Sequence, residues 1–259
     1  MSGAARHSAG AAALPRGRDS NKLKSQAAAA RQAADRLAGV DMVARCALLG
    51  LRPPADDGSV CVRMFGQYLA LQPPEFAAFV AADGARAKGA MPAFCSAKAS
   101  QDECGHAASP ADRILALHYL LCERRVEPTG KLITFRDLPG GQFYYEPFRK
   151  RTAERLIHHV GNDVGKLARM LSAVEHEPAA GSGLAASVAA IEQVRLTLVY
   201  HAGDDEMPPA ADILFDSSIR HVYCTEDAAA LAARLCMKLM GQCETCCGCG
   251  MCDAPAHSS

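Results

Sequence analysis

Cysteines crowd residues 242–259 in a pattern typical of metal ligands. Five thiols occur within ten residues, and four of them recur at every third position: Cys243, Cys246, Cys249 and Cys252. A run this short cannot bury five thiols in a core, whereas consecutive C-x-x-C units let neighbouring thiolates surround one metal centre. The spacing therefore predicts a metal site in this tail.

The identity of the metal depends on the fourth ligand. The first three cysteines have the spacing of a bacterial ferredoxin run, which favours an iron–sulfur cluster, but that run continues with three residues before its fourth cysteine. Here Cys252 follows after only two, so Cys247 or Cys236 could substitute for it. Closely spaced thiolates also suit zinc or copper(I), which is the alternative. Cys95, Cys104 and His106 form a further group whose role as ligands stays open.

A second set of residues could line a ligand pocket. Two arginines flank a Pro-Gly-Gly turn and could hold an anion, while the glycines allow a close backbone approach. Alternatively, the arginines pair with Asp137 and Glu146 and pin the loop. Acidic residues that follow strands could bind a cation or simply be solvated. The set comprises Arg136, Gly140, Gly141, Arg151, Asp204, Asp205 and Asp216.

No catalytic constellation stands out. The sequence shows no nucleophile–base pair, phosphate-binding loop or dinucleotide fingerprint, so it gives no support for an enzyme and no catalytic residue is assigned. His118 lies among apolar residues, which predicts a core histidine paired with a backbone group or a carboxylate.

Composition sets the broad class. The chain has 259 residues, with 28 basic and 28 acidic side chains. This balance gives no electrostatic reason to expect nucleic acid or an anionic membrane as partner. No apolar run is long enough to span a bilayer, and residues 1–20 have the composition of a disordered leader rather than an export signal. We therefore expect a cytoplasmic protein with reduced thiols.

The elements that would position these residues indicate an α+β fold, with a small mixed or antiparallel sheet packed against several helices. We expect one domain over residues 21–241, with a flexible insertion at about 83–108, followed by a cysteine-rich metal-binding tail at 242–259. Helices are predicted from residue 21, over 42–49, over 75–82, from 109 to about 124, over 148–174 with a break at Gly161, and from a cap at Thr225. Strands are predicted within 60–71, at 132–135, 193–200 and 213–216, and a loop at 176–187.

Several interior motifs follow one another in order: His118-Tyr-Leu-Leu, Gly130-x4-Phe135-Arg-Asp-Leu-Pro-Gly-Gly141, Gly203-Asp-Asp-Glu-Met-Pro208 and Ile213-Leu-Phe-Asp216. With these motifs, residues 110–240 resemble a domain-of-unknown-function family of anaerobic bacteria and archaea, some members of which are associated with iron–sulfur domains. The resemblance transfers no catalytic residue, because the family has no established activity.

The resemblance implies a context of anaerobic redox metabolism. Together with the tail, it leads us to expect an accessory protein that binds an iron–sulfur cluster, such as a 4Fe–4S centre, and meets a redox or metabolic partner protein. The alternative is a zinc or copper(I) tail on a non-catalytic domain that binds a small molecule or a partner.

Overall fold

The computed structural model describes residues 17–80 and 106–241. This part of the chain is an α+β domain, as the sequence predicts. Its helices are α1 (Gly17–Leu37), α2 (Met42–Leu49), α3 (Pro110–Leu120), α4 (Gly141–Arg151), α5 (Ala153–Val160), α6 (Val164–Leu171) and α7 (Thr225–Leu239), with 3-10 turns η3 (Phe135–Asp137) and η4 (Ser217–His221).

Within the described residues, eight strands form one antiparallel sheet. They are β1 (Val60–Met64), β2 (Gln67–Gln72), β3 (Ala77–Val80), β4 (Leu132–Ile133), β5 (His176–Pro178), β6 (Leu184–Ile191), β7 (Val194–His201) and β8 (Ala210–Asp216). The order is β3-β2-β1-β6-β7-β8-β4, with β5 paired to β6. The groups β1–β3 and β6–β8 meet through a short pairing of β1 with β6. It is centred on Met64 and Ile191 and includes backbone hydrogen bonds from Phe65 to Ala190 and from Glu192 to Arg63.

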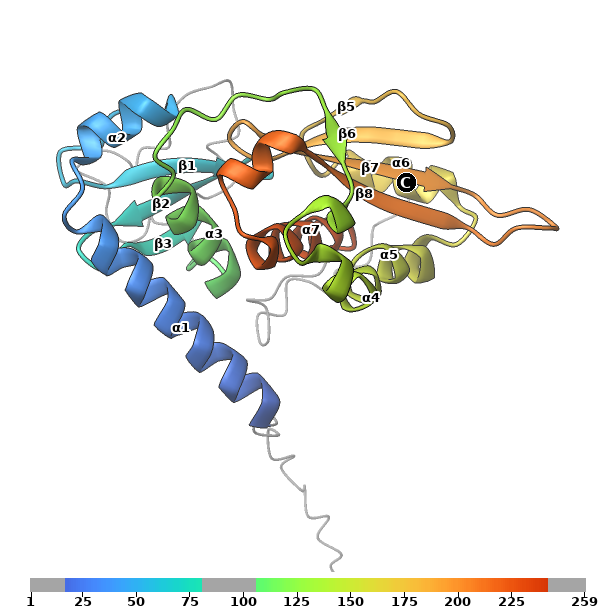
Figure 1. The fold of residues 1–259 in the computed structure, drawn as a ribbon, viewed down its shortest axis with the longest axis horizontal. Coiled ribbons are helices and arrows are strands. Elements are labelled where there is room, and N and C mark those ends of the chain that lie inside the picture. The colour runs from blue at the N-terminus through green and yellow to red at the C-terminus, as the bar shows by residue number, and fades with distance from the viewer. Residues whose placement is uncertain (1–16, 81–105, 242–259) are drawn as a thin grey trace, which may run out of the picture.

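Helices α3, α4, α5 and α7 gather along one side of this sheet (Figure 1). α7 is central among them, since it packs against α3, α4, α5 and α6. The core beneath β8 is aromatic. The rings of Phe135 and Phe148 stack with centroids 4.0 Å apart, and Phe215 lies against both. All three side chains are buried, so the segment after β4 is anchored to the sheet.

Helix α1 differs from the others because half of it leaves the body of the molecule. Figure 1 shows its N-terminal part, in dark blue, projecting from the domain. Ala30 is the first of its described side chains to be buried, and the last part of the helix, through Leu37, packs against α3. The helix begins at Gly17, so it includes the end of the segment predicted as a leader.

Several predicted elements are confirmed. Residues 42–49 are helical, as α2. A hairpin is formed within 60–72, where Phe65 and Gly66 supply the positive φ angles of its turn. Ser109 accepts a hydrogen bond from the backbone N–H of Asp112 and caps α3, which ends at Leu120 rather than near 124.

Other predictions are wrong. Residues 77–80, predicted as part of a helix, form β3, because alternate side chains, Ala78 and Val80, are buried when the segment pairs with β2. Residues 176–187, predicted as a loop, contain β5 and the start of β6, whose small residues alternate inward. The helix predicted over 148–174 also breaks at Thr152, in addition to Gly161.

Candidate functional site

The predicted metal ligands of the tail, Cys243, Cys246, Cys247, Cys249 and Cys252, lie outside the described residues, as do Cys95 and Cys104. The structure does place the point where the tail begins. α7 is closed at its C-terminal end by backbone hydrogen bonds from Met240 and Gly241. The tail therefore follows directly from the end of the central helix.

The remaining predicted ligands are placed differently. Cys236 lies inside the core on α7 with no exposed surface, and burial raises the pKa of its thiol to about 12. A protonated, enclosed thiol does not present a ligand at the surface of the domain. His106 is exposed beside β3, where its carbonyl accepts a hydrogen bond from Val80.

The described thiols differ in oxidation state. Cys46, Cys122, Cys224 and Cys236 are free, whereas Cys61 in β1 is disulfide-bonded, which departs from the expectation that the thiols are reduced. Over residues 17–80 and 106–241, no group of three or more histidine, cysteine or acidic side chains is arranged to hold a metal ion.

The Pro-Gly-Gly turn is shaped by close approach of the chain to itself. Gly140 has a φ of +71°, and a Cβ on Gly141 would stand 2.0 Å from the carbonyl oxygen of Phe135. The Asp137 carboxylate accepts hydrogen bonds from the Thr134 side chain and backbone, and these bonds lower its pKa. The glycines therefore serve the fold of this turn.

The two flanking arginines do not converge on a common point. The Arg136 guanidinium lies over the ring of Tyr145, 3.8 Å from its centroid. Arg151 is exposed at the end of α4. The expected pinning pairs are also different, because Glu146 pairs with Arg149 rather than with either flanking arginine. Arg136 is held by a cation–π contact instead.

Asp216 is a buried anchor for a neighbouring loop. Its carboxylate accepts hydrogen bonds from the backbone N–H groups of Thr129, Gly130 and Ser218, at 2.8–3.0 Å, and from the Thr129 hydroxyl. Burial raises the pKa of this carboxyl, but the hydrogen bonds from Ser218 and Thr129 outweigh burial and lower it. The side chain is thereby occupied within the protein.

Asp204 and Asp205 lie at the opposite end of β8, in the exposed turn that joins it to β7. Asp204 accepts hydrogen bonds from the N–H groups of Glu206 and Met207, which lower its pKa. β8 has seven residues and ends at Asp216, so its length places this turn about 20 Å from Asp216. The seven predicted pocket residues thus fall into separate places.

A polar cluster lies at the start of α7, and the sequence predicted only the pairing of its histidine. His118 Nδ1 is 2.8 Å from Asp227 Oδ2, which confirms the predicted pairing with a carboxylate. The Cys224 thiol donates to the same oxygen at 3.2 Å. Cys224, not Thr225 as predicted, occupies the cap position of α7, while the Thr225 hydroxyl donates to Pro139. Burial raises the pKa of the Cys224 thiol, which favours the protonated form that donates this hydrogen bond.

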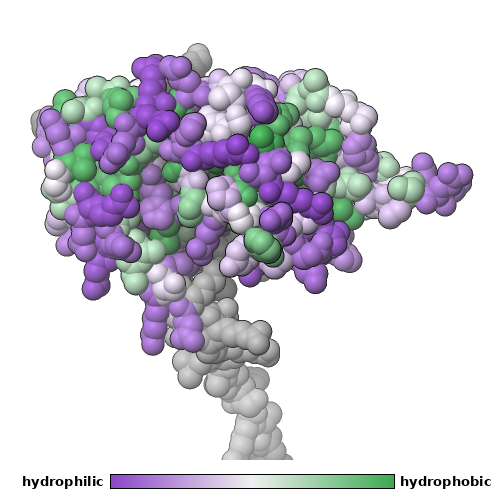
Figure 2. Space-filling view, in the orientation of Figure 1, coloured by the Kyte–Doolittle hydropathy of each residue, from purple (hydrophilic) through white to green (hydrophobic). Residues whose placement is uncertain are grey.

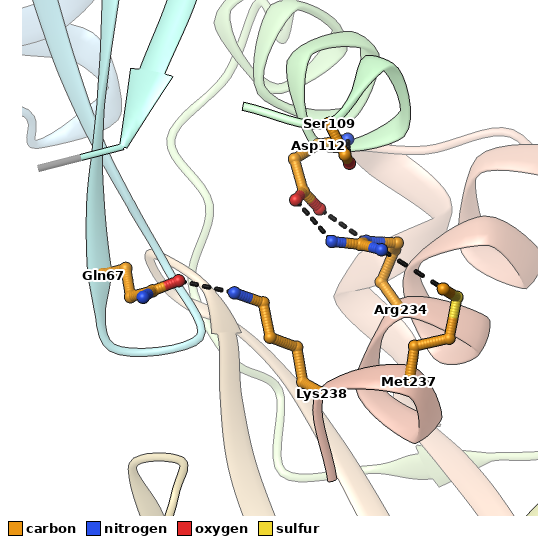
Figure 3. A network of polar contacts seen from close by, with 6 residues as sticks. All are labelled: Gln67, Ser109, Asp112, Arg234, Met237 and Lys238. Atoms are coloured by element: carbon orange, nitrogen blue, oxygen red, sulfur yellow. Dashed lines mark hydrogen bonds and ion pairs between the residues drawn. The ribbon is translucent and has the colours of Figure 1, made fainter. Parts of the chain in front are cut away.

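A second unpredicted feature joins α7 to α3. Figure 3 shows the Arg234 guanidinium facing the carboxylate of Asp112, with two contacts of 2.6 and 2.7 Å. Both residues are more than nine-tenths buried. One turn further along α7, Lys238 reaches Gln67 at the start of β2. The polar side chains of α7 therefore fix its position, and the apolar sequence pattern did not single them out.

Comparison with known proteins gives one match. A family described as a domain of unknown function (DUF3786) matches residues 93–238. No curated protein and no solved structure matches the chain significantly. The family match ends one residue before the end of α7, so the cysteine-rich tail lies beyond it. Among the described helices, none combines the length and the apolar character needed to cross a membrane.

Proposed function

The chain belongs to the DUF3786 family, and we propose that it is a metal-binding accessory protein whose tail holds an iron–sulfur cluster through Cys243, Cys246, Cys249 and a fourth thiolate. The observation that carries the proposal is the spacing of the cysteines, one at every third residue. Thiolates are the ligands that iron–sulfur clusters use, so the donor set fits this group.

The position of the tail supports a metal-binding role that is separate from the fold of the domain. Both the family match and the helical structure end just before the first tail cysteine. In this proposal the domain supplies a fixed base, because α7 is held by a buried ion pair to α3 and packs on α4 to α6. The bound cluster would supply one-electron chemistry, and the partner would be a protein of anaerobic redox metabolism in the cytoplasm.

The experiment is metal analysis of the full chain purified without oxygen. We expect iron and acid-labile sulfide, together with broad visible absorbance that bleaches on reduction. Replacing Cys243, Cys246 and Cys249 together by serine should remove iron and colour. Cys224→Ser is the matched control, since this thiol caps α7 and should leave the iron content unchanged.

Zinc or copper(I) is the second candidate, favoured by the adjacent thiols Cys246 and Cys247 and by the close spacing of Cys249. A colourless protein with one equivalent of zinc, lost in the same triple variant, would replace the iron–sulfur proposal with this one. Full-chain protein that binds none of these metals would contradict both.

A further inference from the structure

Helix α2 is apolar apart from one arginine, yet part of it lies at the surface. Its sequence, MVARCALL, contains one charged residue, Arg45. The guanidinium of Arg45 turns inward and donates hydrogen bonds to the carbonyl groups of Leu120 and Cys122. The outer face is left to Val43, Ala44, Ala47 and Leu48, with Val43 63% exposed. A helix that is apolar all round is normally buried, so this face is typical of a contact surface.

A groove lies beside this face. It has a volume of about 490 Å³ and runs between the end of α1, the start of α2 and the loops before β1 and after β2. Its walls are mainly apolar and include Leu37, Val43 and Phe76. The charged side chains that line it in the described part of the chain are both carboxylates, Asp41 and Asp56. Figure 2 shows hydrophobic side chains exposed among hydrophilic ones at the end of the molecule where Figure 1 places α2.

The protruding half of α1 is complementary to the groove in charge and also has exposed apolar side chains. From Gly17 to Ala29 it extends for about 18 Å at the helical rise of 1.5 Å per residue. Leu23 is 51% exposed, and Ala27 and Ala28 are exposed as well, so its apolar side chains are small except for one. This half carries Arg18, Lys22 and Lys24 against a single acid, Asp19. Among the residues that the structure describes, it is therefore a cationic helix with an exposed apolar stripe.

We propose that the chain forms a two-fold symmetric dimer in which the protruding half of α1 from each copy occupies the groove beside α2 of the other. The last turn of α1 forms one wall of the groove. An antiparallel pair of α1 helices therefore brings the first half of each beside the groove of the other. Small side chains such as Ala27 and Ala28 permit the close approach of two helices. One contact, made twice, thus covers both exposed apolar surfaces.

The distribution of charge supports a second copy of the chain as the occupant of the groove. Lys24 of one chain would approach the carboxylates at the groove of the other, where Asp56 is exposed. Opposite charges at the rim favour this pairing over alternatives, although each contributes little affinity by itself. The apolar contact of Leu23 with the groove supplies the main attraction.

The test is sedimentation velocity of the full chain over a wide range of protein concentration. Reductant and chelator are present, so that the cysteine tail cannot link chains. We expect a dimer that dissociates on dilution. Leu23→Asp and Val43→Asp should each raise the dissociation constant by about tenfold or more, because each change acts twice in a two-fold interface. Circular dichroism checks that these exposed substitutions leave the fold intact.

Phe143→Asp is the matched control. This ring on α4 is 79% exposed but lies outside the groove, so its loss should leave the dimer unchanged. A monomer at every concentration overturns the proposal, and this includes the case in which the groove binds a different protein. A dimer unaffected by both Leu23→Asp and Val43→Asp also overturns it, since association would then use another surface.

A charge exchange tests the orientation. Lys24→Glu and Asp56→Lys should each weaken the dimer, while the two changes in one chain should restore the dissociation constant to within about twofold of the original, as expected for directly interacting residues. Single variants that weaken the dimer with no recovery in the combined variant would overturn the antiparallel arrangement.

Discussion

Gly141 occupies a position where one additional carbon cannot fit. Its missing side chain faces the carbonyl oxygen of Phe135, with 2.0 Å available to a Cβ, whereas a Cβ on Gly140 would meet no atom within 4 Å. We therefore expect Gly141→Ala to lower the free energy of unfolding by about 3 kcal/mol or more, as is typical of backbone clashes. Gly140→Ala, with its positive φ, should cost about 1–2 kcal/mol. Urea unfolding curves of both variants measure the difference.

Comparable losses in the two variants would contradict this account of the turn. The comparison is informative because the residues are adjacent and share the same loop, so general loosening of the loop would affect both. The expected ordering depends on the close approach of Gly141 to Phe135 alone.

The Asp216 carboxylate makes the free energy of unfolding fall as the pH is lowered. The pKa of its carboxyl is lowered in the folded chain. Its contribution to the free energy of unfolding is therefore fully present at pH values above about 3.9, the pKa of an aspartate in an unfolded chain. The contribution is lost as the pH falls through the lower folded value. The stability difference between the native chain and Asp216→Asn should therefore shrink as the pH falls from about 5 to about 3. Chemical unfolding at a series of pH values tests this, and a difference that grows toward acid would contradict it.

The contact between helices α3 and α7 depends on a buried charge pair. Removing one partner leaves the other charge enclosed, so Asp112→Asn or Arg234→Met should each lower the free energy of unfolding by about 3–5 kcal/mol. Replacing both, as Asp112→Leu with Arg234→Met, should recover most of the loss because no uncompensated charge remains. Thermal unfolding of the three variants provides the measurement. A double variant as unstable as the worse single one would show that packing, rather than charge, dominates.

Local signals in the sequence were sufficient to predict the elements that are determined by residues close together in the chain. The cap at Ser109, the turn at Phe65 and Gly66 and the extent of α2 all follow from residues within a few positions. The strand β3 did not follow, because its four residues are Ala-rich and become a strand only by pairing with β2. Tertiary pairing overrides weak local preference in such a segment.

The same distinction applies to the candidate site. The cysteine spacing is a local pattern and needs no fold to be recognised. The pocket prediction, in contrast, assumed that residues after two strands meet, and Asp204 and Asp216 instead lie at opposite ends of one strand. The Arg234–Asp112 pair joins residues 122 positions apart, a separation at which a single sequence carries no signal.

The domain as a whole should fold without its tail. α7 is closed by hydrogen bonds from Met240 and Gly241, so removal of residues 242–259 leaves no helical turn incomplete. We expect the shortened chain to keep its circular dichroism spectrum and a cooperative unfolding transition, and to lose bound metal. A shortened chain that unfolds would instead mean that the tail holds the domain together.

The short pairing between β1 and β6 predicts the order in which parts of the sheet unfold. Strands β1–β3 precede the part matched by the family, and β1 joins β6 through a short pairing centred on Met64 and Ile191. Beyond this pairing, side-chain contacts join Gln67 of β2 to Lys238 of α7 and Arg63 of β1 to Glu175, whereas β6, β7 and β8 pair with one another along most of their lengths. Heat or mechanical load should therefore release residues 60–80 as one unit before the long β6–β8 ladder opens. Hydrogen exchange would show this as a correlated loss of protection of the backbone amides in β1 and β2, at an earlier stage than in β7.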